Sequence, residues 1–133
     1  AEEYLGAEYL GSIKPEQFDE KKINDELILK RARHVITENA RVLEAKECII
    51  NGNIKSFGNL MNESHQSYAK DFEASTEDVD LIVAKSISSG AEGARLTGGG
   101  FGGFTVSLIQ KNKFDEWKKN MKKFYDEENI FGM

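Results

Sequence analysis

Five glycines fall within six consecutive positions of the stretch Thr97-Gly98-Gly99-Gly100-Phe101-Gly102-Gly103-Phe104. Glycine reaches positive φ angles without steric cost, and it has no Cβ that holds another group away from the backbone. The next residues, Phe104-Thr105-Val106-Ser107-Leu108-Ile109, are rich in β-branched and aromatic side chains and predict a strand. Because a second strand is predicted over Gly93–Thr97, the glycines connect the two strands of an antiparallel hairpin.

Two common phosphate-binding motifs are excluded by what surrounds these glycines. Gly98, Gly100 and Gly103 match the letters G-x-G-x-x-G, but a dinucleotide fingerprint must open a helix, and here a strand follows. A Walker A loop requires Lys and then Ser or Thr directly after its last glycine, where this chain has Phe104. The run therefore belongs to neither class of nucleotide-binding loop.

The sequence is compatible with two interpretations of the glycine loop. Its successive amide groups can converge on an anion as a backbone nest, or the glycines can form only a turn or bulge between strands. The length of the loop favours the anion, because a purely structural turn has no reason to give up so much ordering entropy. The residues predicted to lie near a phosphate or nucleotide are Arg95, Thr97, Gly98, Gly99, Gly100, Phe101, Gly102 and Gly103.

Alternation along the two strands predicts which face meets the helices. The apolar set is Ala94, Leu96, Phe104, Val106 and Leu108, and the polar set is Arg95, Thr97, Thr105 and Ser107. We expect the apolar set to face the core and the polar set to lie on the opposite face beside the loop. The alternative for Arg95 is an ordinary surface charge on a half-solvated strand.

Four helices are predicted around the hairpin. Apolar periodicity and capping residues place them at about Asp25–Ile50, Ile54–Asp71, Thr76–Ser88 and Phe114–Glu127. A helix start is also expected at Lys14-Pro15-Glu16, whereas residues 1–13 do not decide between helix and strand. Helices followed by a hairpin and another helix indicate an α+β fold with an antiparallel sheet.

The predicted sheet looks incomplete, because a lone hairpin is only marginally stable. Its candidate third strands are residues 1–13 and Asn129-Ile130-Phe131, or a segment beyond Met133. An uncovered strand edge invites pairing with a second copy of the chain. We therefore expect edge-strand self-association.

Size and composition fit one soluble domain. The chain has 133 residues, of which 31% are charged, and we expect a single domain over 1–133 with a poorly defined segment over 1–17. The formal charge of −5 argues against a nucleic-acid partner, and no apolar run reaches membrane-spanning length. A single cysteine, Cys48, excludes an internal disulfide and fits a reducing cytoplasm.

No catalytic residue or metal site is predicted in this chain. The two histidines, His34 and His65, have no partners at a recognised metal-ligand spacing. Ser64 and His65 are adjacent on a helix and point about 100° apart, so they do not form a nucleophile and base pair. Both histidines are interpreted as structural hydrogen-bonding groups, and Glu38 with Arg41 as a helix-surface pair.

Three blocks of this sequence resemble the GHMP kinases, and within that family the galactokinases. Gly93–Gly103 is similar to the glycine-rich third motif of the family, and Gly58–Ser67 resembles a segment typical of galactokinases. The segment Arg31–Val42 supports the match. Position 99 is glycine where many relatives have alanine, which keeps the character of the loop.

The resemblance implies a ferredoxin-like sandwich of helices on an antiparallel sheet. It also implies a parent enzyme in which ATP, with Mg²⁺ present, phosphorylates the anomeric hydroxyl of galactose or a related sugar. The sugar-contacting first motif, the serine-rich nucleotide loop and the catalytic aspartate of the family have no counterpart here. We therefore expect a carboxy-terminal domain that is inactive alone, binds no ATP or Mg²⁺ alone, and needs an amino-terminal kinase domain as its partner.

Two other functions stay open at the level of the sequence. One is a non-catalytic sugar sensor or interaction module, since some relatives of galactokinases bind ligand and regulate a partner protein. The other is a kinase of the same family that acts on a different sugar. In the parent kinase that the resemblance implies, the loop Gly98–Gly103 would close over the active cleft near the phosphates, and most sugar contacts would lie in the missing half.

Overall fold

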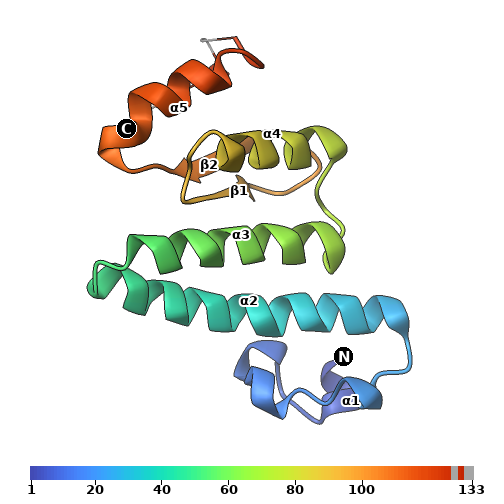
Figure 1. The fold of residues 1–133 in the computed structure, drawn as a ribbon. Helices are drawn as coiled ribbons and strands as arrows, with labels where there is room; N and C mark the ends of the chain where they lie inside the picture. The colour runs from blue at the N-terminus through green and yellow to red at the C-terminus, as the bar shows by residue number, and fades with distance from the viewer. Residues whose placement is uncertain (127–128, 131–133) are drawn as a thin grey trace.

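The glycine-linked hairpin lies between helices, as the ribbon in Figure 1 shows. The computed structural model describes residues 1–126 and 129–130. Its helices and strands are α1 Glu2–Leu5, α2 Glu26–Ile50, α3 Ile54–Lys70, α4 Glu77–Ser88, β1 Gly93–Thr97, β2 Phe104–Leu108 and α5 Phe114–Met121. In Figure 1, α2 and α3 form successive layers below the hairpin, α4 crosses it and α5 lies beyond it. The predicted α+β class is confirmed.

The three long helices begin at the residues that the sequence indicated. Each N-cap side chain accepts a hydrogen bond from a backbone N–H of the first turn: Asp25 from Ile28, Asn53 from Ser56 and Thr76 from Val79. These bonds satisfy amide groups that the helix itself leaves unpaired. Local sequence alone therefore determines where α2, α3 and α4 start.

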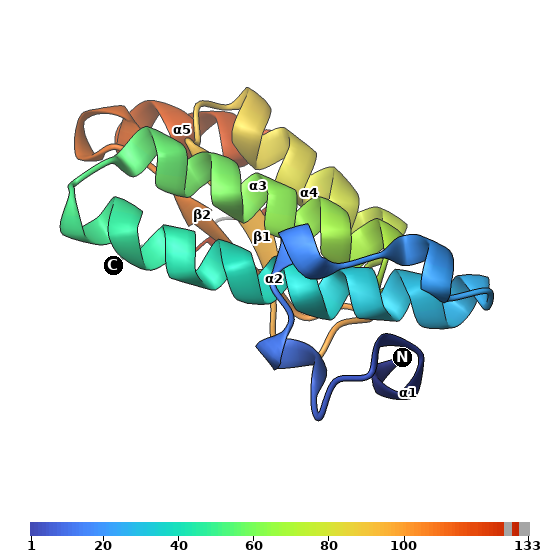
Figure 2. The same cartoon turned by 90° about the horizontal axis from the view of Figure 1, so that it is seen from below.

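Helix α2 buries residues of its first half only, although apolar residues recur along its whole length. Ala32, His34 and Ile36 are buried, whereas the pairs Val42-Leu43 and Ile49-Ile50 are exposed. The buried residues lie in the half of α2 that is covered both by α3 and by the amino-terminal turns, which Figure 2 shows lying against α2. The carboxy-terminal half lacks that second cover.

The ends of the chain contain no further strand within the described residues. The amino-terminal candidate forms α1 and a 3-10 turn, Leu10–Ser12, and the expected helix at Pro15 is a single 3-10 turn, Pro15–Gln17. Helix α5 stops at Met121, short of the predicted end at Glu127, a residue that lies outside the described part. Asn129 and Ile130 are not in a strand, and Phe131 also lies outside the described part.

The register of the hairpin corrects the predicted division into faces. Arg95 pairs with Val106 and Thr97 with Phe104, while Leu96 pairs with Thr105. Directly paired residues point to the same side of an antiparallel sheet, so each face combines apolar residues of one strand with polar residues of the other. Phe104 and Val106, which were expected in the core, are 70% and 45% exposed. The alternation within each strand was correct, but the offset between strands was not.

On its core face, the hairpin contacts α4 through a pair of serine hydroxyl groups, Ser107 of β2 and Ser86 of α4. Ala94 and Leu96 are almost fully buried against α3 and α4. Beside them, the Ser86 hydroxyl of α4 lies 2.7 Å from the Ser107 hydroxyl of β2 and accepts a hydrogen bond from Trp117 Nε1 at 3.0 Å. Ser86 thus links α4 to β2 and α5, and its hydroxyl oxygen accepts the hydrogen bond of the buried Trp117 indole N–H.

Helix α3 covers the outer edge of β1. The Ala94 N–H donates to Asn62 Oδ1 at 2.9 Å, and the Leu96 N–H donates to His65 Nδ1 at 3.3 Å. Two side chains one helical turn apart thus accept from amides that would otherwise pair with another strand. None of the helices in the described part is both long and apolar enough to cross a bilayer.

Candidate functional site

The glycine loop has positive φ angles at most of its positions. Positive φ angles occur at Gly98 (92°), Gly100 (91°), Phe101 (60°), Gly102 (126°) and Gly103 (99°). Gly99, the one position between them without a positive φ, interrupts the series. Changes between right- and left-handed backbone turn successive N–H groups towards one point, which is how nests hold phosphate oxygens.

One side of the loop is anchored to the body of the protein. The Phe101 N–H donates to the Ala74 carbonyl at 2.7 Å. A Cβ added to Gly100 would lie 2.7 Å from that oxygen and 2.9 Å from Ala74 Cβ, so the two backbones touch. Added Cβ atoms at Gly98, Gly99, Gly102 and Gly103 would meet nothing within 4 Å. The loop is therefore fixed at its centre and open on both flanks.

The segment that carries Ala74 is itself fixed by cations of α2. Arg31 Nη1 donates to the Asp71 carbonyl at 2.5 Å and to Glu73 Oε2 at 3.0 Å, and Arg33 Nη1 donates to Asp71 Oδ1 at 3.0 Å. Glu73 adopts a left-handed φ of 57° within this turn. Sequence reasoning missed this support, because no local pattern shows that residues 71–74 lie under a loop some 25 positions later.

Phe101 combines a strained backbone with an exposed ring. Its φ is 60°, a conformation that is unfavourable for a bulky L-residue, and its side chain is 74% exposed. Glycine occupies the positions on both sides, so the backbone alone gives no reason for a phenyl group here. Strain of this kind concentrates at functional sites.

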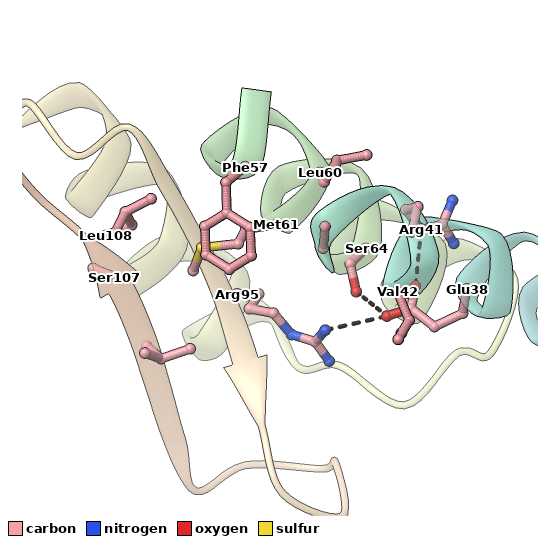
Figure 3. Close-up of a pocket in the computed structure, with 12 residues that line it drawn as sticks. Glu38, Arg41, Val42, Phe57, Leu60, Met61, Ser64, Arg95, Ser107 and Leu108 are labelled. Atoms are coloured by element: carbon pink, nitrogen blue, oxygen red, sulfur yellow. Dashed lines mark hydrogen bonds and ion pairs between the residues drawn. The ribbon is translucent and has the colours of Figure 1, made fainter. Parts of the chain in front are cut away.

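Arg95 points from β1 across to α2 and does not lie free beside the loop (Figure 3). Its Nη1 lies 3.1 Å from Glu38 Oε1, and its Nε donates to the Leu96 carbonyl at 3.0 Å. Glu38 also accepts from Arg41 Nε at 2.8 Å and from the Ser64 hydroxyl. Glu38 and Arg41 are therefore not the simple helix-surface pair that was expected but part of a half-buried network between α2, α3 and β1.

Glu38 is held in its charged form by this network. Burial by itself would raise the pKa of Glu38, but the hydrogen bond from Ser64 and the two guanidinium groups outweigh it and lower the pKa below its ordinary value. The network borders an apolar pocket of about 270 Å³ between α2, α3 and the hairpin. Its walls include Phe57, Met61 and Val106.

Neither histidine has the environment of a catalytic base. His65 Nδ1 accepts the Leu96 N–H, so the proton is on Nε2, which donates to Asp80 Oδ1 at 3.0 Å. His34 Nδ1 lies 2.9 Å from the Ser67 hydroxyl. Burial lowers the pKa of both imidazoles and keeps them neutral. Their interpretation as structural hydrogen-bonding groups is confirmed.

The structure brings most of the predicted site residues together at one end of the hairpin. Thr97, Gly98, Gly99, Phe101 and Gly103 are exposed there and Gly100 and Gly102 are half-buried, whereas the Arg95 guanidinium is engaged by Glu38. Over residues 1–126 and 129–130, no three side chains of His, Cys, Asp or Glu are grouped so that they could hold a metal ion. The backbone of this surface is open at Gly98, Gly99, Gly102 and Gly103.

Comparison with known proteins gives a consistent result. The family model "GHMP kinases C terminal" matches residues 45–127. The chain is 41% identical over 121 residues to the galactokinase of Clostridium acetobutylicum and 38% identical over 124 residues to that of Lactobacillus helveticus. These matches cover 89% and 91% of this chain but 31% and 32% of the relatives, so the chain spans about a third of their length.

A solved structure supports the same relationship. The fold is similar to that of Lactococcus lactis galactokinase complexed with galactose, with a TM-score of 0.81 and 35% sequence identity. The superposition covers 90% of this chain and 32% of that protein.

Proposed function

The chain belongs to the GHMP kinase C-terminal family, and on that premise we propose that it is the carboxy-terminal domain of a galactokinase. The parent would transfer the γ-phosphoryl group of ATP to the anomeric hydroxyl of galactose. One observation carries the proposal: β1, which leads into the exposed glycine loop with its positive φ angles, is held by the helix segment Gly58–Ser67 that resembles galactokinases, through Asn62 and His65. Residues 1–133 act as one domain in this proposal.

The proposed role of the loop is electrostatic. Phosphoryl transfer depends mainly on positioning and on stabilising the charge of the transferring group. ATP supplies that group when it is bound, and the open backbone around Gly98–Gly99 and Gly102–Gly103 suits contact with its phosphate oxygens. The Phe101–Ala74 hydrogen bond fixes the loop beforehand, so little ordering is needed when the anion arrives. Arg95 and Thr97 complete the phosphate-proximal set, with Arg95 acting at longer range from its position on Glu38.

The metal and the catalytic base are assigned to the rest of the parent. Mg²⁺ prefers carboxylate and water oxygens, and the described residues offer no acidic cluster that fits it. We therefore give Mg²⁺ no ligand in this chain. The partners in this proposal are an amino-terminal kinase domain and galactose or a related sugar, and the compartment is the cytoplasm, consistent with the single free Cys48.

An activity assay of both the parent and the isolated chain tests this function. The longer protein that contains this chain should form a sugar 1-phosphate from galactose and ATP, detected by phosphorus NMR. The 133-residue chain should give no turnover above a protein-free control. Turnover by the isolated chain would contradict the domain assignment, and a parent that binds sugar without phosphorylating it would be a sensor.

A substrate panel tests the sugar. If the parent phosphorylates galactose with a kcat/KM well above that for other hexoses, the proposed substrate holds. If another sugar is preferred, the chain still belongs to a GHMP kinase, but galactose is the wrong substrate. The two results separate the reaction class from the specificity.

A further inference from the structure

Ala74 is bound through both of its backbone groups. Its carbonyl accepts the Phe101 N–H of the glycine loop at 2.7 Å, and its own N–H donates to the Tyr68 carbonyl of α3 at 3.2 Å. The Ala74 side chain is fully buried, and Tyr68 Cε1 lies 3.3 Å from the place that a Cβ on Gly100 would take. The position of the loop therefore depends on the turn that follows α3, residues 71–74.

One side chain of α2, Arg31, contacts each of the three residues that precede Ala74. Its Nη1 donates to the Asp71 carbonyl at 2.5 Å and to Glu73 Oε2 at 3.0 Å, and its guanidinium carbon lies 5.6 Å from the centre of the Phe72 ring. Asp71 is the C-cap of α3, at the end of a helix where carbonyl groups have no partner within the helix. Arg31 therefore fixes the direction in which the chain leaves α3.

The conformation of Glu73 indicates that the turn depends on cations of α2. Its φ of 57° is left-handed, a conformation in which glycine is the usual residue. Both oxygens of its carboxylate are bound by α2, Oε2 by Arg31 and Oε1 by Lys30 Nζ at 3.3 Å. The hydrogen bonds from Arg31 and Lys30 lower the pKa of Glu73 and keep the carboxylate charged. Ion pairs from another helix thus hold a residue with a Cβ in a turn that suits glycine.

We propose that Arg31 is a positioning residue for the glycine loop and acts through the turn 71–74. The loop amides then meet the phosphates of ATP in the geometry that the reaction needs, a consequence that rests on the proposed kinase function. The effect of Arg31 on the loop itself does not rest on it. Ion pairs as exposed as Arg31–Glu73, at 36% and 44%, add little to global stability, so losing this pair changes the local geometry more than the folding.

Hydrogen exchange of the loop in the parent protein tests the positioning role directly. Arg31→Met removes the guanidinium and keeps an unbranched apolar side chain beside Phe72. Amides of Gly98–Gly103, followed by mass spectrometry, should then exchange with deuterium faster, because the hydrogen bond that anchors the loop opens more often. Exchange in α5 should not change. Glu73→Gln, a milder change at an exposed position, should act in the same direction with a smaller effect.

Steady-state kinetics of the parent test the consequence for the reaction. Arg31→Met should raise KM for ATP on the order of tenfold and leave KM for galactose unchanged, because the loop is placed at the phosphates. A smaller folded fraction by itself would lower kcat and leave both KM values unchanged. Arg31→Lys should recover part of the loss, since an ammonium group can still donate to the Asp71 carbonyl.

Two variants control for charge and for stability. Lys46→Met removes a cation from the exposed side of the other half of α2, and Trp117→Phe weakens the core by removing the hydrogen bond to Ser86. Both should keep the original loop exchange and KM for ATP. The proposal is overturned if Arg31→Met leaves loop exchange unchanged, if it leaves KM for ATP unchanged in an active parent, or if Trp117→Phe changes both as much. A parent without sugar kinase activity in which Arg31→Met still speeds loop exchange would contradict the proposed function and support the positioning role.

Discussion

Gly58 of α3 and Gly93 of β1 meet backbone to backbone. A Cβ on Gly58 would lie 2.4 Å from the Glu92 carbonyl oxygen, and a Cβ on Gly93 would lie 2.3 Å from the Gly58 carbonyl oxygen. This contact brings α3 close enough for Asn62 and His65 to bind the edge of β1. The two sequence blocks that carry the family resemblance are therefore in direct contact, and one of them positions the other.

Gly58→Ala should lower the free energy of unfolding by about 1–3 kcal/mol. Alanine is the better helix former, but here its Cβ would overlap the backbone of Glu92, which cannot move without displacing β1. Urea unfolding followed by circular dichroism measures the change. Asn59→Ala, at the neighbouring exposed position of the same helix, is the control and should be neutral or stabilising. Equal effects of the two substitutions would show that the close contact is unimportant.

Asn62→Ala should leave the Ala94 N–H without its acceptor. An unsatisfied buried amide costs about 1–3 kcal/mol, and the loss should be local to the edge of β1. Hydrogen exchange measured by NMR should show faster exchange at Ala94, with little change at Gly93, which faces β2. Glu63→Ala, on the exposed side of α3, should leave both amides unchanged. Unaltered protection of Ala94 in Asn62→Ala would mean that the side chain does not cap this edge.

Phe101→Gly should be more stable than Phe101→Ala by about 1 kcal/mol. Both variants remove the ring, but only glycine relieves the left-handed backbone at φ 60°. Thermal unfolding measures the stability of both variants. Because neither has the ring, the difference between them gives the cost of holding a residue with a Cβ at this φ angle. If alanine is as stable as glycine, the loop relaxes out of the left-handed conformation in solution.

Gly102→Ala in the parent enzyme should lower kcat on the order of 10²-fold, because alanine disfavours the φ of 126° that turns the neighbouring amides. Gly99→Ala is the matched control, since Gly99 has no positive φ and open space around it, and it should keep normal kinetics. Gly100→Val should also depress kcat, but its Cβ overlaps Ala74, so loss of activity there combines loop chemistry with misfolding. If Gly102→Ala kept a normal kcat and a normal KM for ATP, the loop would have no role in phosphoryl transfer and would serve only as a turn.

The stability of the chain should fall as the pH drops below about 6.5. Burial lowers the pKa of His65 and His34 in the folded state, with Asp80 partly opposing the effect at His65. The unfolded chain therefore takes up protons first, and the stability that is complete above the unfolded pKa is lost as the pH falls towards the folded pKa. Urea midpoints measured against pH should decline less steeply in His65→Gln. An identical slope in that variant would assign the pH dependence to other groups.

The elements of the fold were predictable because their signals are local. Capping residues and glycines determine where α2, α3, α4 and the hairpin begin and end, and these depend only on neighbours in sequence. The burial of α2 was not predictable in the same way. Leu43 and Ile50 follow an amphipathic pattern, yet they are exposed, because the amino-terminal turns that cover a second side of α2 reach only its first half.

The sequence by itself determined the family and the glycine loop, because the loop needs glycine at positions whose φ other residues disfavour. Tertiary structure decided what surrounds that loop. The offset between the strands put Phe104 outside, and the position of α2 engaged Arg95 with Glu38. Ala74 came under Phe101 through contacts between residues far apart in the chain. All three arrangements depend on how the helices and strands pack against one another, so no local sequence pattern predicts them.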